Sequence, residues 1–237
     1  GLMELMKGNS NEEKLKILAA FTGEKQTGPK EMAVRMEKAR SIYDLLVDKA
    51  GMDAKEAKLI ALDPGKAEKL EALSGKAGTA YSLKLAKAIN RVMKATQNLS
   101  PEQRFDILAA LTGKEDTGSR DMARRINGRV QKGLALANVL VKGIGIDRDF
   151  ALWIGLDPTK AEKLGFLSAI EGKYYSNKLG AAIGNLMDLI KDRSYDERFK
   201  VLASFVVEGK DMTSVNMIKE TAEKVQKVVG LANIDLG

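Results

Sequence analysis

The stretch LDPGKAEKL at residues 62–70 returns at residues 156–164 as LDPTKAEKL. In both places Asp-Pro predicts the start of a helix, because an Asp side chain caps free backbone amides and proline fits the first helical turn. Around this block, residues 62–93 and 156–187 are identical at 18 of 32 positions, at a spacing of 94 residues. The sequence therefore predicts an internal repeat built from helices.

A second block extends the repeat along the chain. EKLKILAAFTG at residues 13–23 returns at 103–113 as QRFDILAALTG, at a spacing of 90, so copy two holds four additional residues between the two blocks. A third copy begins with ERFKVLASF at residues 197–205, and VQKVVGLANI at 225–234 matches VQKGLALANV at 130–139. We therefore expect two full copies and part of a third.

The repeat divides the chain into four segments. They are the last helix of a preceding repeat at residues 1–11, repeat 1 at 12–99, repeat 2 at 100–193 and a partial repeat 3 at 194–237. Since the sequence at both ends lies within a repeat, we expect the chain to be a piece of a larger protein. The alternative is that the half-repeats are terminal caps, which are common in repeat proteins.

Each unit of 90–94 residues is expected to hold about five helices. In copy one they cover about residues 11–22 and 29–50, two short helices that begin at the capping residues Asp53 and Asp63, and about residues 79–97. No segment alternates apolar and polar residues as a half-buried strand does. Because the joins between copies lack a flexible Gly/Ser linker, we expect an all-α tandem repeat whose copies dock end to end as a rod or superhelix.

Local patterns predict the caps and the buried faces. Asp53 and Glu56 have the spacing of a capping box, as do Ser100 and Gln103 at the start of copy two. The long second helix recurs in copy two at about residues 120–143. The residues expected on buried faces are Leu15, Leu18, Phe21, Tyr81, Leu85, Ile89, Val92, Met122, Ile126, Val130, Trp153, Tyr175, Leu179, Ile183 and Leu186.

The composition excludes several kinds of chemistry. Among 237 residues there is no Cys and no His, so disulfides, Cys-ligated zinc and every catalytic centre that uses His are excluded. Acidic pairs such as Asp44 and Asp48 lie beside basic residues, as solvated charges do. The Thr-Gly pairs at residues 22–23 and 27–28 are interpreted as helix-ending turns, with a phosphate-binding loop as the alternative. We expect no enzyme activity and no cofactor.

An excess of basic residues is the main hint of an anionic partner. The chain has 39 Lys+Arg against 32 Asp+Glu, a net charge of +7. The candidate contacts lie on the second helix of each copy: Lys30, Arg35, Lys38, Arg120, Arg124, Arg125, Arg129 and Lys132. Against this idea, Glu220 stands where copy two has Arg125, and interleaved aromatic residues are missing. Sequence-nonspecific binding of nucleic acid is therefore the alternative function.

Apolar residues near both ends are the candidates for self-association, since incomplete repeats leave apolar faces uncovered. They are Leu2, Met3, Leu5, Met6, Val225, Val228 and Leu231. The favoured function is a non-enzymatic scaffold, a structural or protein-interaction segment whose partner is protein, either itself or neighbouring repeats.

The sequence carries no signal-peptide pattern, and no apolar stretch reaches the roughly 20 residues that span a bilayer. We therefore expect a cytoplasmic or virion-associated location and no membrane span. Helix-rich repeat chains without Cys also occur in virions and mobile elements, so a viral protein is a further expectation.

Overall fold

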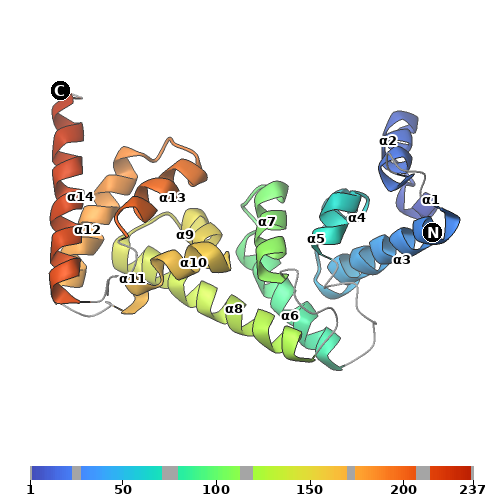
Figure 1. Cartoon of the computed structure of the whole chain (residues 1–237), viewed down its shortest axis with the longest axis horizontal. Helices are drawn as coiled ribbons and strands as arrows, with labels where there is room; N and C mark the ends of the chain where they lie inside the picture. Colours follow the sequence, from blue (N-terminus) through green and yellow to red (C-terminus); the bar gives the residue numbers. More distant parts are fainter. Residues whose placement is uncertain are drawn as a thin grey trace. The chain divides into compact units, whose positions relative to one another are not determined.

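A computed structural model describes residues 2–22, 28–70, 80–112, 120–169, 174–206 and 214–235. Within these ranges the chain forms helices joined by turns, with no β-strand (Figure 1). The expected all-α class is therefore confirmed for the described part of the chain. Gly23 and Thr27 of the predicted Thr-Gly turns lie outside it.

The chain divides into two compact units, Gly1–Val130 and Gln131–Gly237. The boundary between them falls inside one helix, α8 (Arg120–Val139). Each unit thus contains part of that helix.

Unit 1 gathers its first helices around a shared apolar cluster. Besides the first part of α8, its helices are α1 (Leu2–Leu5), α2 (Asn11–Thr22), α3 (Pro29–Asp44), the π-helical turn η1 (Leu45–Lys49), α4 (Ala54–Ala61), α5 (Pro64–Lys69), α6 (Ala80–Ala95) and α7 (Pro101–Thr112). Leu5, Met6, Phe21, Ala39 and Leu62 are all buried in the cluster. The cluster therefore holds α1, α2, α3 and the end of α4 together.

Unit 2 is organised around a long helix pair. After the end of α8 come the π-helical turn η3 (Leu140–Ile144), α9 (Arg148–Gly155), α10 (Pro158–Leu164), α11 (Phe166–Ala169), α12 (Tyr174–Leu189), α13 (Tyr195–Ser204) and α14 (Val215–Asp235). Helix α12 lies along α14 (Figure 1). Leu179 and Ile183 of α12 and Ile218 and Val225 of α14 are buried. Their apolar faces supply much of the core of this unit.

The long second helix of each copy ends in a π-helical turn, where the sequence predicted a continuous α-helix over 29–50 and 120–143. The α-helical part ends at Asp44 in one case and at Val139 in the other. Each π turn is followed by a glycine with positive φ, +68° at Gly51 and +80° at Gly145. Glycine adopts this left-handed conformation without the steric penalty of a side chain, so it ends the helix at both places.

The predicted helix starts are confirmed at the capping residues. The Asp53 carboxylate accepts hydrogen bonds from two backbone amides, and so do those of Asp63 and Asp157. Ser100 and Gln103 exchange the two hydrogen bonds of a capping box. Glu56 differs from the prediction, because its carboxylate pairs with an arginine of α7 and does not reach back to the backbone amide of Asp53.

The predicted buried faces are confirmed at most described positions. The buried residues among them are Phe21, Leu85, Ile89, Val92, Ile126, Val130, Trp153, Leu179, Ile183 and Leu186. The side chains of Tyr81, Met122 and Tyr175 lie outside the described part. The prediction is wrong at Leu15, whose side chain is 66% exposed because no described helix covers that face of α2. None of the described helices is long and apolar enough to span a membrane.

Candidate interaction surfaces

Two of the predicted basic residues hold the fold together. The Arg35 guanidinium donates a hydrogen bond of 3.0 Å to the carbonyl oxygen of Phe21, and that of Arg129 donates one of 3.0 Å to the carbonyl of Leu111. Each carbonyl belongs to the last turn of a helix, where backbone oxygens lack an intrahelical donor and the helix dipole is negative. Both arginines therefore close the end of the helix that precedes theirs.

The other predicted basic residues differ in exposure. Lys30, Arg124, Arg125 and Lys132 are exposed, whereas Lys38 is half-buried. The side chain of Arg120 lies outside the described part. Because Arg35 and Arg129 are engaged by backbone carbonyls, the predicted set is not a uniform basic face.

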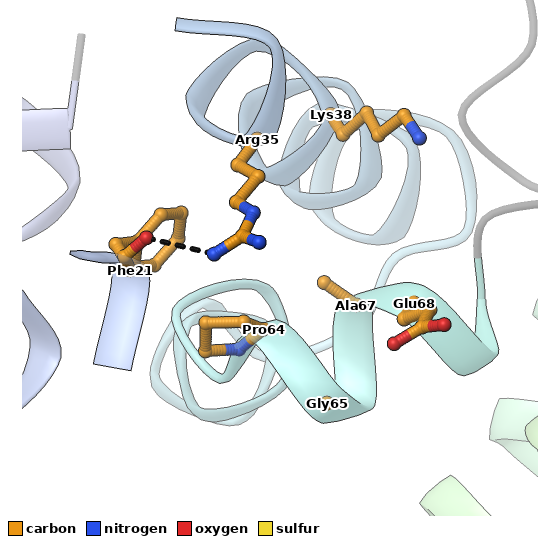
Figure 2. A pocket seen from close by; sticks show the side chains of 7 residues that line it. All are labelled: Phe21, Arg35, Lys38, Pro64, Gly65, Ala67 and Glu68. Carbon is orange, nitrogen blue, oxygen red and sulfur yellow. Dashed lines mark hydrogen bonds between the residues drawn. The ribbon is translucent and has the colours of Figure 1, made fainter. Parts of the chain in front are cut away.

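Arg35 and Lys38 are brought together at a pocket of about 430 Å³ in unit 1. Its other lining residues are Phe21, Pro64, Gly65, Ala67 and Glu68. Figure 2 shows Arg35 directed at the Phe21 carbonyl, Lys38 extending away from it, and Glu68 on the α5 side.

The pocket has basic and acidic side chains around a partly apolar wall, but its arginine is already occupied. Besides the Phe21 carbonyl, the Arg35 guanidinium contacts the Glu31 carboxylate at 2.8 Å. The described residues contain no group of three or more acidic side chains placed to hold a metal ion. The pocket thus offers a recess with few polar groups left for a ligand.

A buried ion pair joins α4 to α7 in unit 1. The Arg104 guanidinium donates a hydrogen bond to the Glu56 carboxylate, and the two side chains are only 14% and 7% exposed. Burial raises the pKa of Glu56, and the positive charge of Arg104 opposes that shift. Next to this pair, the ammonium groups of Lys66 and Lys69 lie 5.3 and 5.8 Å from the ring centre of Phe105.

A buried arginine also joins α9 to α13 in unit 2, with a different partner. The Arg198 guanidinium lies 4.1 Å from the ring centre of Phe150, and the whole residue is 6% exposed. Tyr195 and Trp153 complete an aromatic cluster with Phe150, with ring centres 5.0 to 6.0 Å apart. Burial, helped by the charges of Asp147 and Asp149, raises the pKa of the Tyr195 hydroxyl.

The sequence contains a signal for these two arginines, an Arg-Phe pair that recurs in the repeated block. Arg104-Phe105 and Arg198-Phe199 occupy the same place in the repeated block, 94 residues apart. Their partners could not be matched by identity, because position 56 is Glu and position 150 is Phe. Only the three-dimensional contacts connect the two arginines with those positions.

The predicted self-association residues separate into buried and exposed groups. Leu5, Met6 and Val225 are at most 3% exposed. The prediction that they are available for self-association is therefore wrong, because each packs inside its own unit. Met3, Val228 and Leu231 are 69%, 42% and 65% exposed. The side chain of Leu2 lies outside the described part. The sequence also missed four exposed apolar residues: Leu15, Val34, Leu59 and Val215.

Comparison with known proteins identifies no relative. The sequence matches no protein-family model, no curated protein and no solved structure.

Proposed function

We propose that this chain is a non-enzymatic segment of tandem helical repeats that serves as a structural or protein-interaction element. The observation that carries the proposal is a pair of equivalent arginines, Arg104, which is half-buried, and Arg198, which is buried. In each unit this arginine joins a short helix, α4 or α9, to the Ser-capped helix on which the arginine lies, α7 or α13. A contact that recurs at the repeat spacing is what stacked repeat units need at each join.

Other recurrent local structures support the same proposal. Three capping boxes occur at the repeat spacing, formed by Ser10 with Glu13, Ser100 with Gln103 and Ser194 with Glu197. Helix α8 has 20 residues and α3 has 16, so the four additional residues of copy two correspond to about one more helical turn.

The proposed arrangement consists of copies docked in a fixed relation to one another. A repeated unit adds length and surface without requiring a new site, which suits a scaffold. The partner would be protein, either a neighbouring repeat or another copy of the chain. Val228 and Leu231 are the candidates for such a contact, because both are exposed apolar residues on one helix.

Sedimentation velocity from micromolar to near-millimolar concentration tests this proposal. We expect the wild type to form oligomers as its concentration rises, and the double variant Val228→Lys/Leu231→Lys to remain monomeric. Val34→Lys is the matched control, since Val34 is 51% exposed on a different helix. A wild type that stays monomeric throughout this range would contradict self-association through α14.

Sequence-nonspecific binding of nucleic acid is the second candidate. The observation in its favour is the exposure of Lys30, Arg124 and Lys132 together with the net charge of +7. Titration of a labelled duplex of about 30 base pairs, and of its single strand, at about 50 and 200 mM salt tests it. Contact with phosphates predicts binding that weakens by orders of magnitude over this range. If neither nucleic acid binds at the lower salt concentration, the net positive charge does not serve to bind nucleic acid.

A further inference from the structure

Arg104 and Arg198 occupy equivalent positions on their helices. The amide of Arg104 donates a hydrogen bond of 3.0 Å to the carbonyl of Ser100, and the amide of Arg198 donates one of 3.0 Å to the carbonyl of Ser194. Each arginine therefore lies in the first turn of a helix that begins at a capping serine. A phenylalanine follows it directly in both helices, Phe105 in one and Phe199 in the other.

The facing residues are equivalent as well. Glu56 and Phe150 both come three residues after a capping aspartate, Asp53 in one unit and Asp147 in the other. In both units the Asp side chain accepts a hydrogen bond from the backbone amide of that third residue. The facing side chain is therefore held in the first turn of a capped helix in both cases.

A guanidinium buried in this way requires compensation, because removing an unpaired charge from water is strongly unfavourable. A carboxylate provides it through opposite charge and a hydrogen bond, as Glu56 does. The face of an aromatic ring provides it through a cation–π contact, as Phe150 does at 4.1 Å. Arg198 has no ion pair with a carboxylate among the described residues, and its ring partners are Phe150 and, at 5.7 Å, Tyr195 of its own helix.

The residue after the arginine is covered from the same helix pair. Phe105 is 5% exposed beneath Lys66 and Lys69 of α5, and Phe199 lies 6.1 Å from Trp153 of α9. Helix α2 provides the comparison, because Lys14 and Leu15 occupy the matching positions and the amide of Lys14 donates to the carbonyl of Ser10. No described helix pair covers α2 there, and Leu15 is 66% exposed. The cover over the residue that follows the arginine thus comes from α5 in unit 1 and from α9 in unit 2.

We propose that the helix pair α4–α5 and the helix α9 are docking surfaces for a Ser-capped helix with a basic residue followed by a large apolar residue. We further propose that the residue at position 56 or 150 favours a basic helix there because it compensates the arginine charge, by carboxylate pairing in one case and by ring stacking in the other. This inference rests on the proposed repeat function and specifies the contact between consecutive sequence repeats. Its partner is therefore another helix of the same repeat type.

The test replaces Glu56 in the full chain with Phe, Leu and Ala, and measures urea unfolding by far-UV circular dichroism. If the docking surface accepts either kind of compensation, the new ring in E56F gives Arg104 a cation–π contact like that of Arg198 with Phe150. We expect the folding equilibrium constant of E56F to exceed that of E56L by about thirtyfold, the size of a desolvated cation–π contact. E56A removes the carboxylate, as E56L does, and also leaves the space that a leucine side chain would fill, so it is expected to be the least stable of the three.

The same substitutions in an Arg104→Met background are the matched control. There the advantage of E56F over E56L should disappear, because no cation remains to stack on the ring. A second readout does not depend on stability: in E56F the ring current should shift the side-chain proton resonances of Arg104 upfield.

Two results would overturn the inference. One is equal stability of E56F and E56L with Arg104 present, and the other is an E56F protein whose Arg104 resonances do not shift. Neither result would bear on self-association through α14, which the sedimentation experiment measures separately with Val228 and Leu231. Failure of the docking rule and failure of the proposed repeat function are therefore distinguishable.

Discussion

Glu56 and Arg104 are an ion pair in which each partner has one buried atom left unsatisfied. One Glu56 oxygen accepts a hydrogen bond from the arginine, while Glu56 Oε1 and Arg104 Nε are buried with no hydrogen-bond partner among the described residues. Because both charges are removed from water and neither is fully hydrogen-bonded, desolvation is only partly offset. The raised pKa of Glu56 follows from that imbalance.

The free energy of unfolding should depend on pH through the protonation of Glu56. Its pKa lies above the ordinary value of 4.5 in the folded state, so the folded protein takes up this proton at higher pH than the unfolded chain does. The contribution of Glu56 to stability therefore rises as pH falls from neutral towards 4.5. In urea unfolding, we expect the wild type to gain stability relative to Glu56→Gln over this interval.

Glu197 provides a control of opposite sign. Hydrogen bonds from Ser194 lower the pKa of Glu197, so its contribution is present above 4.5 and is lost as pH falls through its folded-state pKa. Glu197→Gln should therefore approach the wild type in stability at low pH. If Glu56→Gln and Glu197→Gln follow the same trend with pH, the assignment of the two shifts is wrong.

The crossing of α8 and α9 within unit 2 requires glycine. A Cβ atom on Gly133 would lie 2.2 Å from the carbonyl oxygen of Gly155. We expect Gly133→Ala to lower the free energy of unfolding by about 3 kcal/mol, the upper part of the range for overpacked cores. Urea unfolding followed by the fluorescence of Trp153, the single tryptophan, measures it, since Trp153 lies in α9 and is 5% exposed.

The same helix contains a matched control. A Cβ on Gly128 would have no neighbour within 4 Å, so Gly128→Ala should raise stability by up to about 1 kcal/mol through helix propensity alone. Equal effects at the two glycines would mean that the backbones of α8 and α9 do not approach as closely as the structure indicates.

The capping boxes should contribute similar amounts to stability. Ser194 accepts a hydrogen bond from the Glu197 amide at the start of α13, and Ser100 accepts one from the Gln103 amide at the start of α7. We expect Ser194→Ala and Ser100→Ala each to lower the free energy of unfolding by about 1 kcal/mol. Thermal unfolding of the two variants measures this, with Ser194→Asp as the conservative replacement that should keep the cap.

The sequence was sufficient for the features that depend on near neighbours. Asp53, Asp63 and Asp157 cap helices as their Asp-x-x and Asp-Pro patterns indicate, because caps involve residues only two or three positions apart. The contacts that join helices could not be predicted in this way. Glu56 fits a capping box by spacing, yet its carboxylate binds Arg104, 48 residues further along the chain.

Leu15 is a second residue whose surroundings could not be predicted from the sequence, because it fits a buried face by spacing and yet is exposed. Its spacing with Leu18 and Phe21 predicts one buried face, but burial also requires an element that covers it. Phe105 at the equivalent position has the two lysines of α5 over its ring, and Leu15 has no such cover among the described residues. Periodicity therefore identifies the apolar face of a helix without identifying what packs on it.

Arg129 and Arg124 should separate the roles of folding and binding on α8. The Arg129 guanidinium closes the end of α7 through the Leu111 carbonyl, so Arg129→Gln should lower the free energy of unfolding by about 1.5 kcal/mol, as expected for a hydrogen bond from a charged group. Arg124 is exposed, and Arg124→Gln should change stability by less than about 0.5 kcal/mol. If the chain binds nucleic acid through this helix, duplex titration at low salt should show the larger loss of affinity for Arg124→Gln. A larger loss for Arg129→Gln, measured where that variant is fully folded, would mean that the Arg129 guanidinium leaves the Leu111 carbonyl to contact phosphate.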